Sequence, residues 1–236
     1  MVADVSMPTP GTIVVASGDL ARYPGFTVSL LHLLRPPGTE FRFQVGLNVA
    51  ASCNQGIRDM VGEWVWIMGD DHILPPDTLA RLLAHDVDVV VPLCVRRKPP
   101  FIPVIFKEPL PGDSPWKFPP WKWSQLPKDG GLHRIHVAGS AGMLIRRHVL
   151  EKIGDPWFEV GQQSSEQLNE DSYFCTKLAT AGIPLHVDLD THIGHITPSV
   201  LWPAHRADGT WTVDVRFDRE WGMQLPLGAA EKGWGD

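Results

Sequence analysis

The sequence is short of the features that mark secreted and membrane proteins. Only three cysteines occur in 236 residues, Cys53, Cys94 and Cys175, and their separations fit neither a full set of disulfides nor a zinc ribbon. No apolar run approaches the about 20 residues that span a bilayer, and the first ten residues lack a basic start and an apolar core. We therefore expect a cytoplasmic protein with reduced core cysteines, no membrane partner and no secretory signal.

Neither sign of charge dominates, and tyrosine is scarce. The net charge is -6, and 20% of residues are charged against 43% hydrophobic, a balance that excludes a disordered chain. The length is sufficient for a substantial core. Ten tryptophans stand against two tyrosines. This excess of tryptophan makes the placement of the tryptophans along the chain informative.

Basic residues, tryptophan and proline gather in one stretch of the chain. Between Arg96 and Lys128 there are seven basic and two acidic residues, a net +5, so the remainder carries -11. The same stretch holds nine of the 22 prolines, a density that forbids a helix or a central strand. The pattern predicts a long irregular loop over residues 107–131, and loops of this length in compact domains are usually functional or mobile.

On either side of this loop, strand patterns alternate with helix patterns. Such alternation predicts an α/β fold, with a mostly parallel twisted sheet flanked by helices, in a single domain of residues 1–236. In such sheets ligands bind beyond the carboxyl ends of the strands. The expected strands are residues 12–17, 41–46, 64–68, 87–92, 133–138, 143–145 and 211–215, and the expected helices are residues 28–34, 48–60, 76–85, 147–153 and 168–181.

Asp70, Asp71 and His72 come directly after the expected buried strand 64–68. Two adjacent carboxylates at that point repel each other unless solvent or a cation neutralises them. Oxygen ligands beside an imidazole suit Mn²⁺ or Mg²⁺. The alternative is a turn that leads into the helix at Pro76, which is the commoner role of an isolated acidic pair.

Four blocks in order resemble the GT-A fold nucleotide-sugar glycosyltransferases. The resemblance covers about residues 12–198 and implies a Rossmann-like GT-A fold, with residues 1–98 binding the nucleotide sugar and residues 99–236 forming the acceptor half. The blocks are Asn54-Gln55-Gly56-Ile57 followed by Gly62 to His72, then Gly139 to Arg146, then Glu170 to Cys175, and finally Val187-Asp188 with Gly194-His195.

This resemblance implies a divalent cation, Mn²⁺ or Mg²⁺, on the diphosphate of the donor. Asp71 and His195 are then the preferred ligands, with His72 beside them, and Asp70 faces the ribose or the sugar. A second register, Asp70-x-His72, makes Asp70 and His72 the ligands. The chain departs from the family pattern at Gly69, where a first carboxylate is expected. His192 competes with His195, and a lone histidine in an apolar stretch is more often a core residue.

The resemblance also implies a catalytic role for the pair Glu170-Asp171. Asp171 then deprotonates the acceptor hydroxyl, which requires a carboxylate within hydrogen-bond reach, and Glu170 binds donor sugar or acceptor. From the residues alone, acids at the start of a helix also complement its dipole. Inversion and retention both stay open.

Four further residues are expected to bind the donor. Ser17 and Asp19 follow the first strand, where the nucleotide base or ribose is expected. Arg97 offers a guanidinium to phosphate, unless it lies in a solvated basic turn. Asn54 contacts donor or acceptor, or else satisfies nearby backbone groups.

The basic, aromatic loop is expected to bind the acceptor through Trp116, Trp121, Trp123, Lys117 and Lys122. Tryptophan stacks on flat rings while ammonium groups meet phosphate. Together with UDP-glucose as the default donor, this makes a hydroxymethylated pyrimidine in DNA the sharpest hypothesis for the hydroxyl acceptor. The alternative is a loop that its own tryptophans pack over the core. A nucleotidyltransferase with the same acidic metal site and a non-catalytic carbohydrate-binding module also remain open.

Overall fold

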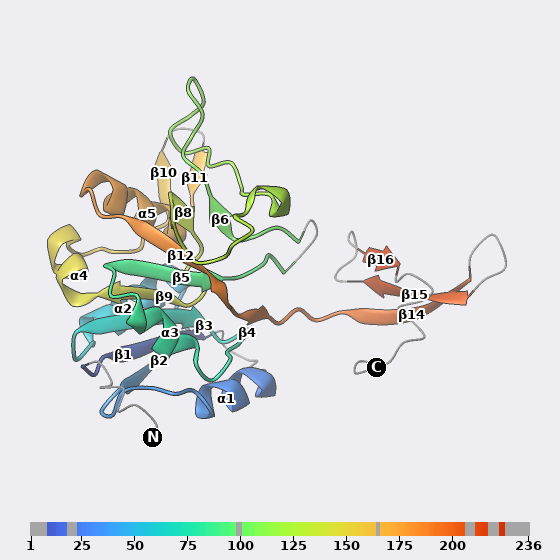
Figure 1. Cartoon of the computed structure of the whole chain (residues 1–236), viewed down its shortest axis with the longest axis horizontal. Coiled ribbons are helices and arrows are strands. Elements are labelled where there is room, and N and C mark those ends of the chain that lie inside the picture. Colours follow the sequence, from blue (N-terminus) through green and yellow to red (C-terminus); the bar gives the residue numbers. More distant parts are fainter. Residues whose placement is uncertain are drawn as a thin grey trace.

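A sheet of seven strands forms the body of the protein (Figure 1). The computed structural model describes residues 9–17, 23–97, 101–163, 166–205, 211–216 and 222–224. Five strands of the sheet run in one direction, and β9 and β7 run against them. The predicted α/β fold with a mostly parallel sheet is therefore confirmed. In order across the sheet, the strands are β2 (Glu40–Val45), β1 (Thr12–Ser17), β3 (Trp64–Gly69), β9 (Met143–Arg146), β5 (Val89–Leu93), β12 (Leu185–His192) and β7 (Leu132–Ile135).

The central strand β3 is buried on both of its faces. Trp64 and Trp66 point to one side of the sheet, and Val65 and Ile67 point to the other, and all are at most 1% exposed. The indole nitrogen of Trp66 donates to the carbonyl oxygen of Gly142 at 2.7 Å, so its one polar atom is satisfied. An apolar run of this kind suits a strand covered by helices on both sides.

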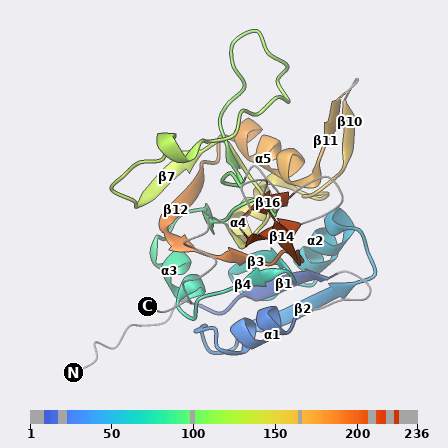
Figure 2. The ribbon, with the colours of Figure 1, turned by 90° about the vertical axis from the view of Figure 1, so that its right-hand side faces the viewer.

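Helices cover both faces of the sheet (Figures 1 and 2). Helices α2, α4 and α5 pack on one face, and α1 and α3 pack on the other. Asn48 caps α2, because its side chain accepts from the backbone nitrogen of Ala51 at 2.8 Å. The helices are α1 (Pro24–Leu31), α2 (Val49–Arg58), α3 (Thr78–Ala84), α4 (Arg147–Ile153) and α5 (Glu170–Thr180).

Small sheets attach to this body, and two of them shape the site. Strand β4 (His72–Ile73) pairs with β13 (Gly194–His195), a contact that the sequence did not predict. The strand predicted over residues 133–138 is two strands, because β7 stays on β12 whereas β8 (Val137–Ala138) turns to pair with β6 (Ile105–Phe106). The others are β10 (Gly161–Gln163) with β11 (Glu166–Leu168), and β14 (Val200–His205) with β15 (Trp211–Arg216) and β16 (Gly222–Gln224).

The segment between β6 and β7 is irregular, as the prolines predict. It holds a short 3₁₀ helix, η1 (Trp123–Gln125), and projects from the sheet as the green loop at the top of both views (Figures 1 and 2). Phe118, Trp121 and Leu126 pack against the core, which anchors the loop. At the other end of the chain, β14, β15 and β16 stand apart from the main sheet (Figure 1). Among the described helices, none has the length and apolar character needed to cross a bilayer.

Gly56 sets the distance between α2 and β1. A Cβ at this position would lie 2.3 Å from Val14 Cγ1 and 2.8 Å from Val14 Cγ2. Gly56→Ala should therefore lower the free energy of unfolding by about 1–3 kcal/mol, although alanine is the better helix former. Urea unfolding checks this, with Gln55→Ala on the same helix as the control that changes stability little. A Gly56→Ala variant as stable as the wild type would contradict the close packing.

Candidate functional site

A cavity of about 500 Å³ lies beyond the carboxyl ends of β1 and β3. The first turns of α2 form one wall, and the loop after β8 forms another. This is the edge at which ligands bind in sheets of this type. Six residues predicted from the sequence line the cavity together: Ser17, Asp70, Asp71, His72, Asp171 and His195.

The two adjacent carboxylates have different partners. The hydroxyl of Ser17 donates to Asp70 Oδ2 at 2.6 Å, which ties Asp70 to the end of β1. Asp71 Oδ2 instead lies 2.8 Å from Arg97 Nη1. A Cβ at Gly69 would lie 2.8 Å from Asp71 Oδ1, so the glycine leaves room for this carboxylate. The pair thus avoids mutual repulsion because each carboxylate has a partner of its own.

His72 and His195 meet because β4 and β13 pair in register. The antiparallel ladder places His195 directly opposite His72, and their rings stack with centroids 4.7 Å apart. His195 Nε2 lies 3.4 Å from Asp71 Oδ2, and His72 Nδ1 lies 3.2 Å from Asp71 Oδ1. The backbone nitrogen of Ile196 also donates to the carbonyl oxygen of Asp71 at 2.8 Å. His192, the competing candidate, is exposed and bonds to Leu189.

Hydrogen bonds fix which nitrogen of each histidine faces the cluster. His195 Nδ1 donates to the carbonyl oxygen of Val95 at 2.8 Å, which leaves Nε2 toward Asp71. His72 Nδ1 lies near two acceptors, the Asp71 carboxylate and the Gly69 carbonyl oxygen. His72 Nε2 is buried, and no hydrogen-bond partner is found for it among the described residues. A buried ring nitrogen without a hydrogen-bond partner, on a ring whose other nitrogen lies beside a carboxylate, fits a metal ligand.

Opposite charges stabilise one another in this cluster. Burial alone would raise the pKa of Asp71, yet the hydrogen bond from His195 and the charges of the two histidines and Arg97 hold it below its ordinary value. Burial would likewise lower the pKa of His195, but Asp71 and Cys94 raise it to about 9. Without a metal ion, protonated His195 and Arg97 therefore neutralise the carboxylate of Asp71.

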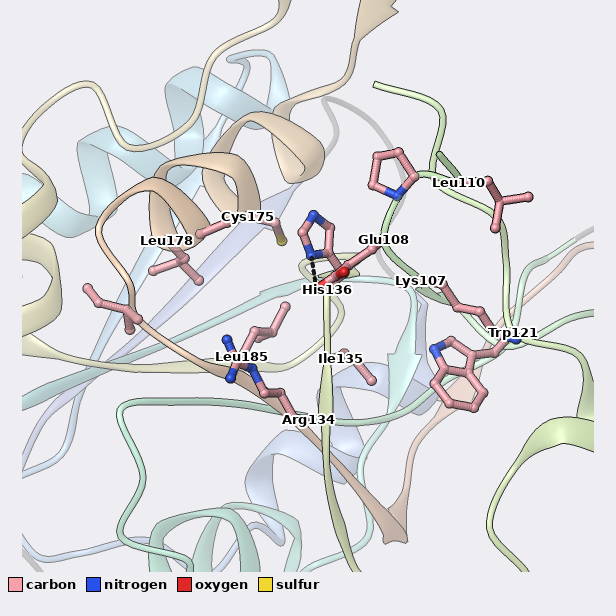
Figure 3. A pocket seen from close by; sticks show the side chains of 13 residues that line it. Lys107, Glu108, Leu110, Trp121, Arg134, Ile135, His136, Cys175, Leu178 and Leu185 are labelled. Atoms are coloured by element: carbon pink, nitrogen blue, oxygen red, sulfur yellow. Dashed lines mark ion pairs between the residues drawn. The ribbon is translucent and has the colours of Figure 1, made fainter. Parts of the chain in front are cut away.

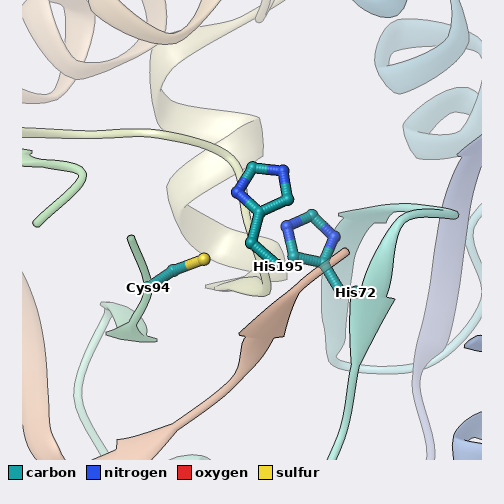
Figure 4. Close-up of side chains that lie close together, drawn as sticks. All are labelled: His72, Cys94 and His195. Carbon is teal, nitrogen blue, oxygen red and sulfur yellow. The ribbon is translucent and has the colours of Figure 1, made fainter. Parts of the chain in front are cut away.

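Cys94 completes the cluster from the end of β5 (Figure 4). Ligand atoms of Cys94, His72 and His195 all lie within 4.8 Å of one another. Burial would raise the pKa of the Cys94 thiol, but hydrogen bonds and charge from the two histidines lower it to about 7. The sequence predicts a buried, reduced cysteine here, and the thiol is indeed free and 3% exposed. Its histidine neighbours come from β4 and β13, and no local sequence pattern reveals them.

Asp171 is in the opposite electrostatic situation. Its carboxyl is enclosed, and Oδ1 has no hydrogen-bond partner among the described residues. Burial, followed by the charge of neighbouring Glu170, raises its pKa from 3.8 to about 7, although hydrogen bonds from the side chain and backbone of Ser140 act against this. Asn169 caps α5 by accepting from Ser172, which fixes the first turn on which Asp171 stands.

A second cavity, of about 430 Å³, lies on the other side of Asp171. Asp171, Val104 and Gly139 line both cavities, so they form the boundary between them. A Cβ at Gly139 would lie 2.8 Å from Val104 Cγ1 and 3.5 Å from Asp171 Oδ2, so only glycine leaves this boundary open. Aromatic residues of the loop line the second cavity, among them Phe106, Trp116 and Phe118.

A third cavity, of about 570 Å³, shares no lining residue with the other two (Figure 3). It lies between the loop and α5, with Cys175 and Leu178 on one side and Trp121 on the other. Lys107 Nζ sits 4.7 Å from the centre of the Trp121 ring. Trp121 therefore lines a different cavity from Asp171, whereas Trp116 lines one that Asp171 also lines.

The remaining predicted residues lie outside these two site cavities or outside the described chain. The side-chain amide of Asn54 is used by backbone, since Nδ2 donates to Phe158 O at 2.7 Å and Oδ1 accepts from the nitrogens of Trp157 and Phe158. Asn54 therefore bonds backbone groups, which is the alternative to a contact with donor or acceptor. Trp123 is 50% exposed and donates to Phe101. Lys117 pairs with Asp113, Lys122 is exposed at the start of η1, and Asp19 lies outside the described residues.

Several cavity residues were not singled out from the sequence. Ser52 presents a buried hydroxyl for which no partner is found among the described residues, and Ser140 bonds to Asp171. Ser140 lies inside the block Gly139 to Arg146, so the resemblance marks its neighbourhood. Nothing in the local pattern marks Ser52, Cys94 or Val104, because their role depends on which elements pack together.

The profile of glycosyl transferase family 2 matches residues 28–154, more than half of the chain. Two solved structures share the fold at low sequence identity. A197 from STIV is 13% identical with a TM-score of 0.53, over 92% of this chain and 98% of that one. GalNAc-T7, solved with UDP, GalNAc and Mn²⁺, is 11% identical with a TM-score of 0.54, over 78% of this chain and 43% of that one. No curated protein matches in sequence.

The family match and the two structural likenesses agree with the blocks found in the sequence. The family match decides against a nucleotidyltransferase and against a non-catalytic carbohydrate-binding module. The chain belongs to glycosyl transferase family 2 and is a glycosyltransferase with the GT-A fold.

Proposed function

We propose that the enzyme transfers a sugar from a nucleoside diphosphate sugar, with UDP-glucose as the default donor, to a hydroxyl acceptor in a metal-dependent reaction. The observation that carries the proposal is the position of Asp171. This carboxylate forms part of the boundary between a cavity with a metal-ligand cluster and a cavity lined by aromatic rings. A base at that boundary meets the acceptor hydroxyl on one side and the sugar on the other.

The donor cavity would hold Mn²⁺ or Mg²⁺ through Asp71 and His195, with His72 beside them. These residues fit a divalent cation for two reasons. His72 Nε2 has no hydrogen-bond partner among the described residues, and the Asp71 carboxylate already attracts positive charge from the side chains around it. A bound divalent ion supplies Lewis-acid stabilisation of the diphosphate as it leaves. The structural likeness to GalNAc-T7, solved with UDP and Mn²⁺, supports this choice of donor and ion.

Arg97 is suited to the phosphates of the donor. Its guanidinium now pairs with Asp71 at 2.8 Å, and its side chain is half-exposed. If Asp71 serves as a metal ligand, Arg97 loses that partner and becomes available to phosphate oxygens, which it can hold with two hydrogen bonds. Ser17 orients Asp70 toward the ribose or the sugar, and Asp19, beyond the same strand, is proposed to meet the base or ribose.

Asp171 is proposed to remove the proton of the acceptor hydroxyl. A pKa of about 7 keeps the carboxylate partly ionised at neutral pH and makes it a stronger base than an ordinary aspartate. Ser140 holds the carboxyl through hydrogen bonds, and Glu170 raises its basicity through charge and is proposed to contact donor sugar or acceptor. Trp116, Phe118 and Phe106 offer ring surfaces against which the acceptor can stack.

The acceptor is proposed to be a flat, anionic hydroxyl compound, in its sharpest form a hydroxymethylated pyrimidine in DNA. Trp116 reaches the acceptor cavity, and Trp121, Trp123, Lys117 and Lys122 extend from the same loop. The ring of a base would enter between the aromatic residues while the loop lysines meet the phosphates. In this proposal residues 1–98 supply most of the donor site, to which His195 is added from the second half, and residues 99–236 supply most of the acceptor site.

The first prediction concerns donor binding. A UDP-sugar with Mn²⁺ at about one hundred times its dissociation constant should raise the melting temperature by about 5–10 °C. Asp71→Ala should lose this shift and Mn²⁺-dependent hydrolysis of the UDP-sugar, whereas Asp59→Ala, an exposed acid, should keep both. Thermal melting with a panel of nucleotide sugars measures the effect. A wild-type protein that no nucleotide sugar stabilises would count against the donor site.

The second prediction concerns pH. Because the proposed base works only when ionised, kcat should rise as the pH increases through about 7 and level off above it. Asp171→Asn should lower kcat by about 10²–10⁴-fold and remove this limb of the profile.

Burial of the Asp171 charge also destabilises the folded protein above the pKa that this carboxyl has in the unfolded chain. Asp171→Asn should therefore be more stable than the wild type at pH 8 but not at pH 4. Asp59→Asn, at an exposed acid outside both cavities, should change neither kcat nor this dependence of stability on pH. An unchanged pH limb in Asp171→Asn would exclude the base.

The third prediction concerns the acceptor. Duplex DNA that contains 5-hydroxymethylpyrimidine should shift the protein in a gel at low salt and shift it less as salt rises. Lys117→Glu with Lys122→Glu should abolish the shift, whereas Lys152→Glu, on α4, should not. If the wild-type protein gives no shift, DNA is not the acceptor, while the donor prediction stands.

A further inference from the structure

Cys94 lies where a ligand of the cation site would lie. Its sulfur and one ring nitrogen each of His72 and His195 are all within 4.8 Å of one another, and the three side chains converge from different elements (Figure 4). Cys94 directly follows β5, His72 begins β4 and His195 ends β13. Since a bond to zinc is about 2.0–2.3 Å long, a modest contraction would bring all three donors onto one ion.

The ring nitrogens of His72 and His195 are oriented as in a metal site. His195 Nδ1 is held by the carbonyl oxygen of Val95, the residue directly after Cys94, so the same turn fixes the ring and carries the thiol. His72 Nε2 is buried with no partner found in the described part of the chain. A histidine whose other nitrogen bonds a carbonyl or carboxylate oxygen is the usual form of a metal ligand.

We propose that Cys94 is a ligand of this cation site, which makes it a site of two imidazoles and one thiolate, with the Asp71 carboxylate beside it, that binds Zn²⁺ or Co²⁺ in preference to Mg²⁺ and Mn²⁺. The proposal rests on the metal site proposed at Asp71 and His195 and adds to it the sulfur donor. Thiolate and imidazole are the donors that zinc favours, whereas Mg²⁺ prefers oxygen. The thiol proton passes to solvent as the bond between sulfur and metal forms.

The other two cysteines provide matched controls. Cys175 is equally buried, but its Sγ donates to the carbonyl oxygen of Ala138 and lies in the wall of the third cavity. Cys53 stands on α2 within the core. Neither belongs to the His72 and His195 cluster, so a signal from a metal–sulfur bond in this chain is assigned to Cys94 by substitution alone.

The test is a titration of the full chain with Co²⁺, followed by absorption spectroscopy. The wild-type protein should show the near-ultraviolet charge-transfer band of a cobalt–thiolate bond at one equivalent, and Zn²⁺ should remove the band. Cys94→Ser and Cys94→Ala should lose the band and bind Zn²⁺ at least about tenfold more weakly, whereas Cys175→Ser should keep it. Circular dichroism confirms that the variants fold.

The outcomes separate this proposal from the proposed function. A wild-type protein that binds Co²⁺ without the band, or a band that persists in Cys94→Ser, overturns the role of Cys94. If the band appears as expected but no nucleotide sugar stabilises the protein with Mn²⁺, the donor proposal fails and the sulfur ligand stands. If nucleotide sugars bind with Mn²⁺ and the band is absent, the donor proposal stands and the role of Cys94 as a ligand fails.

Discussion

The site depends on one electrostatic constraint, the need to neutralise Asp71 at the end of a buried strand. A carboxylate in that position is costly unless opposite charge surrounds it. Two histidines and Arg97 surround it here, and they come from three separate segments of the chain. The pairing of β4 with β13 contributes to this neutralisation, because it brings His195 beside His72 and Asp71. The backbone nitrogen of Ile196 also donates to the carbonyl oxygen of Asp71. The segments that carry His72, Arg97 and His195 thus meet at the acidic end of β3.

Two carboxylates in one cavity experience opposite surroundings. Asp71 is surrounded by cationic groups and has a lowered pKa, whereas Asp171 is enclosed beside Glu170 and has a raised one. Environments that move two pKa values apart are the usual way in which a protein gives similar side chains different roles. One carboxylate is suited to binding a cation and the other to holding and releasing a proton. The arrangement also implies a stability cost at Asp171, of the kind that functional sites retain.

The sequence predicted the elements better than their contacts. Apolar runs and caps placed β1, β3, α2 and α4 closely, since those signals are local. Helix α1 begins four residues earlier than expected, because Pro24 suits the first turn of a helix. The pairing of β4 with β13 carries no local signal, and it decides which histidine joins the cluster. The sequence predicts Cys94 only as a core residue, because a thiol buried among apolar side chains and a thiol beside two imidazoles carry the same local pattern.

The tryptophans divide according to the surface that each one meets. Trp64 and Trp66 alternate with apolar neighbours on a strand covered from both sides, so both are core residues. The loop tryptophans differ although they lie within eight residues of one another: Pro119 and Pro120 separate Trp116 from Trp121, and the 3₁₀ helix η1 begins at Trp123. Trp116 faces the Asp171 boundary, Trp121 faces a separate cavity under Lys107, and Trp123 is half-exposed. A loop that merely covered the core would bury all three alike. Of the three, only Trp116 lines the cavity that Asp171 also lines, together with Phe106 and Phe118, so in the proposed reaction the rings available for stacking beside the base come from these three residues.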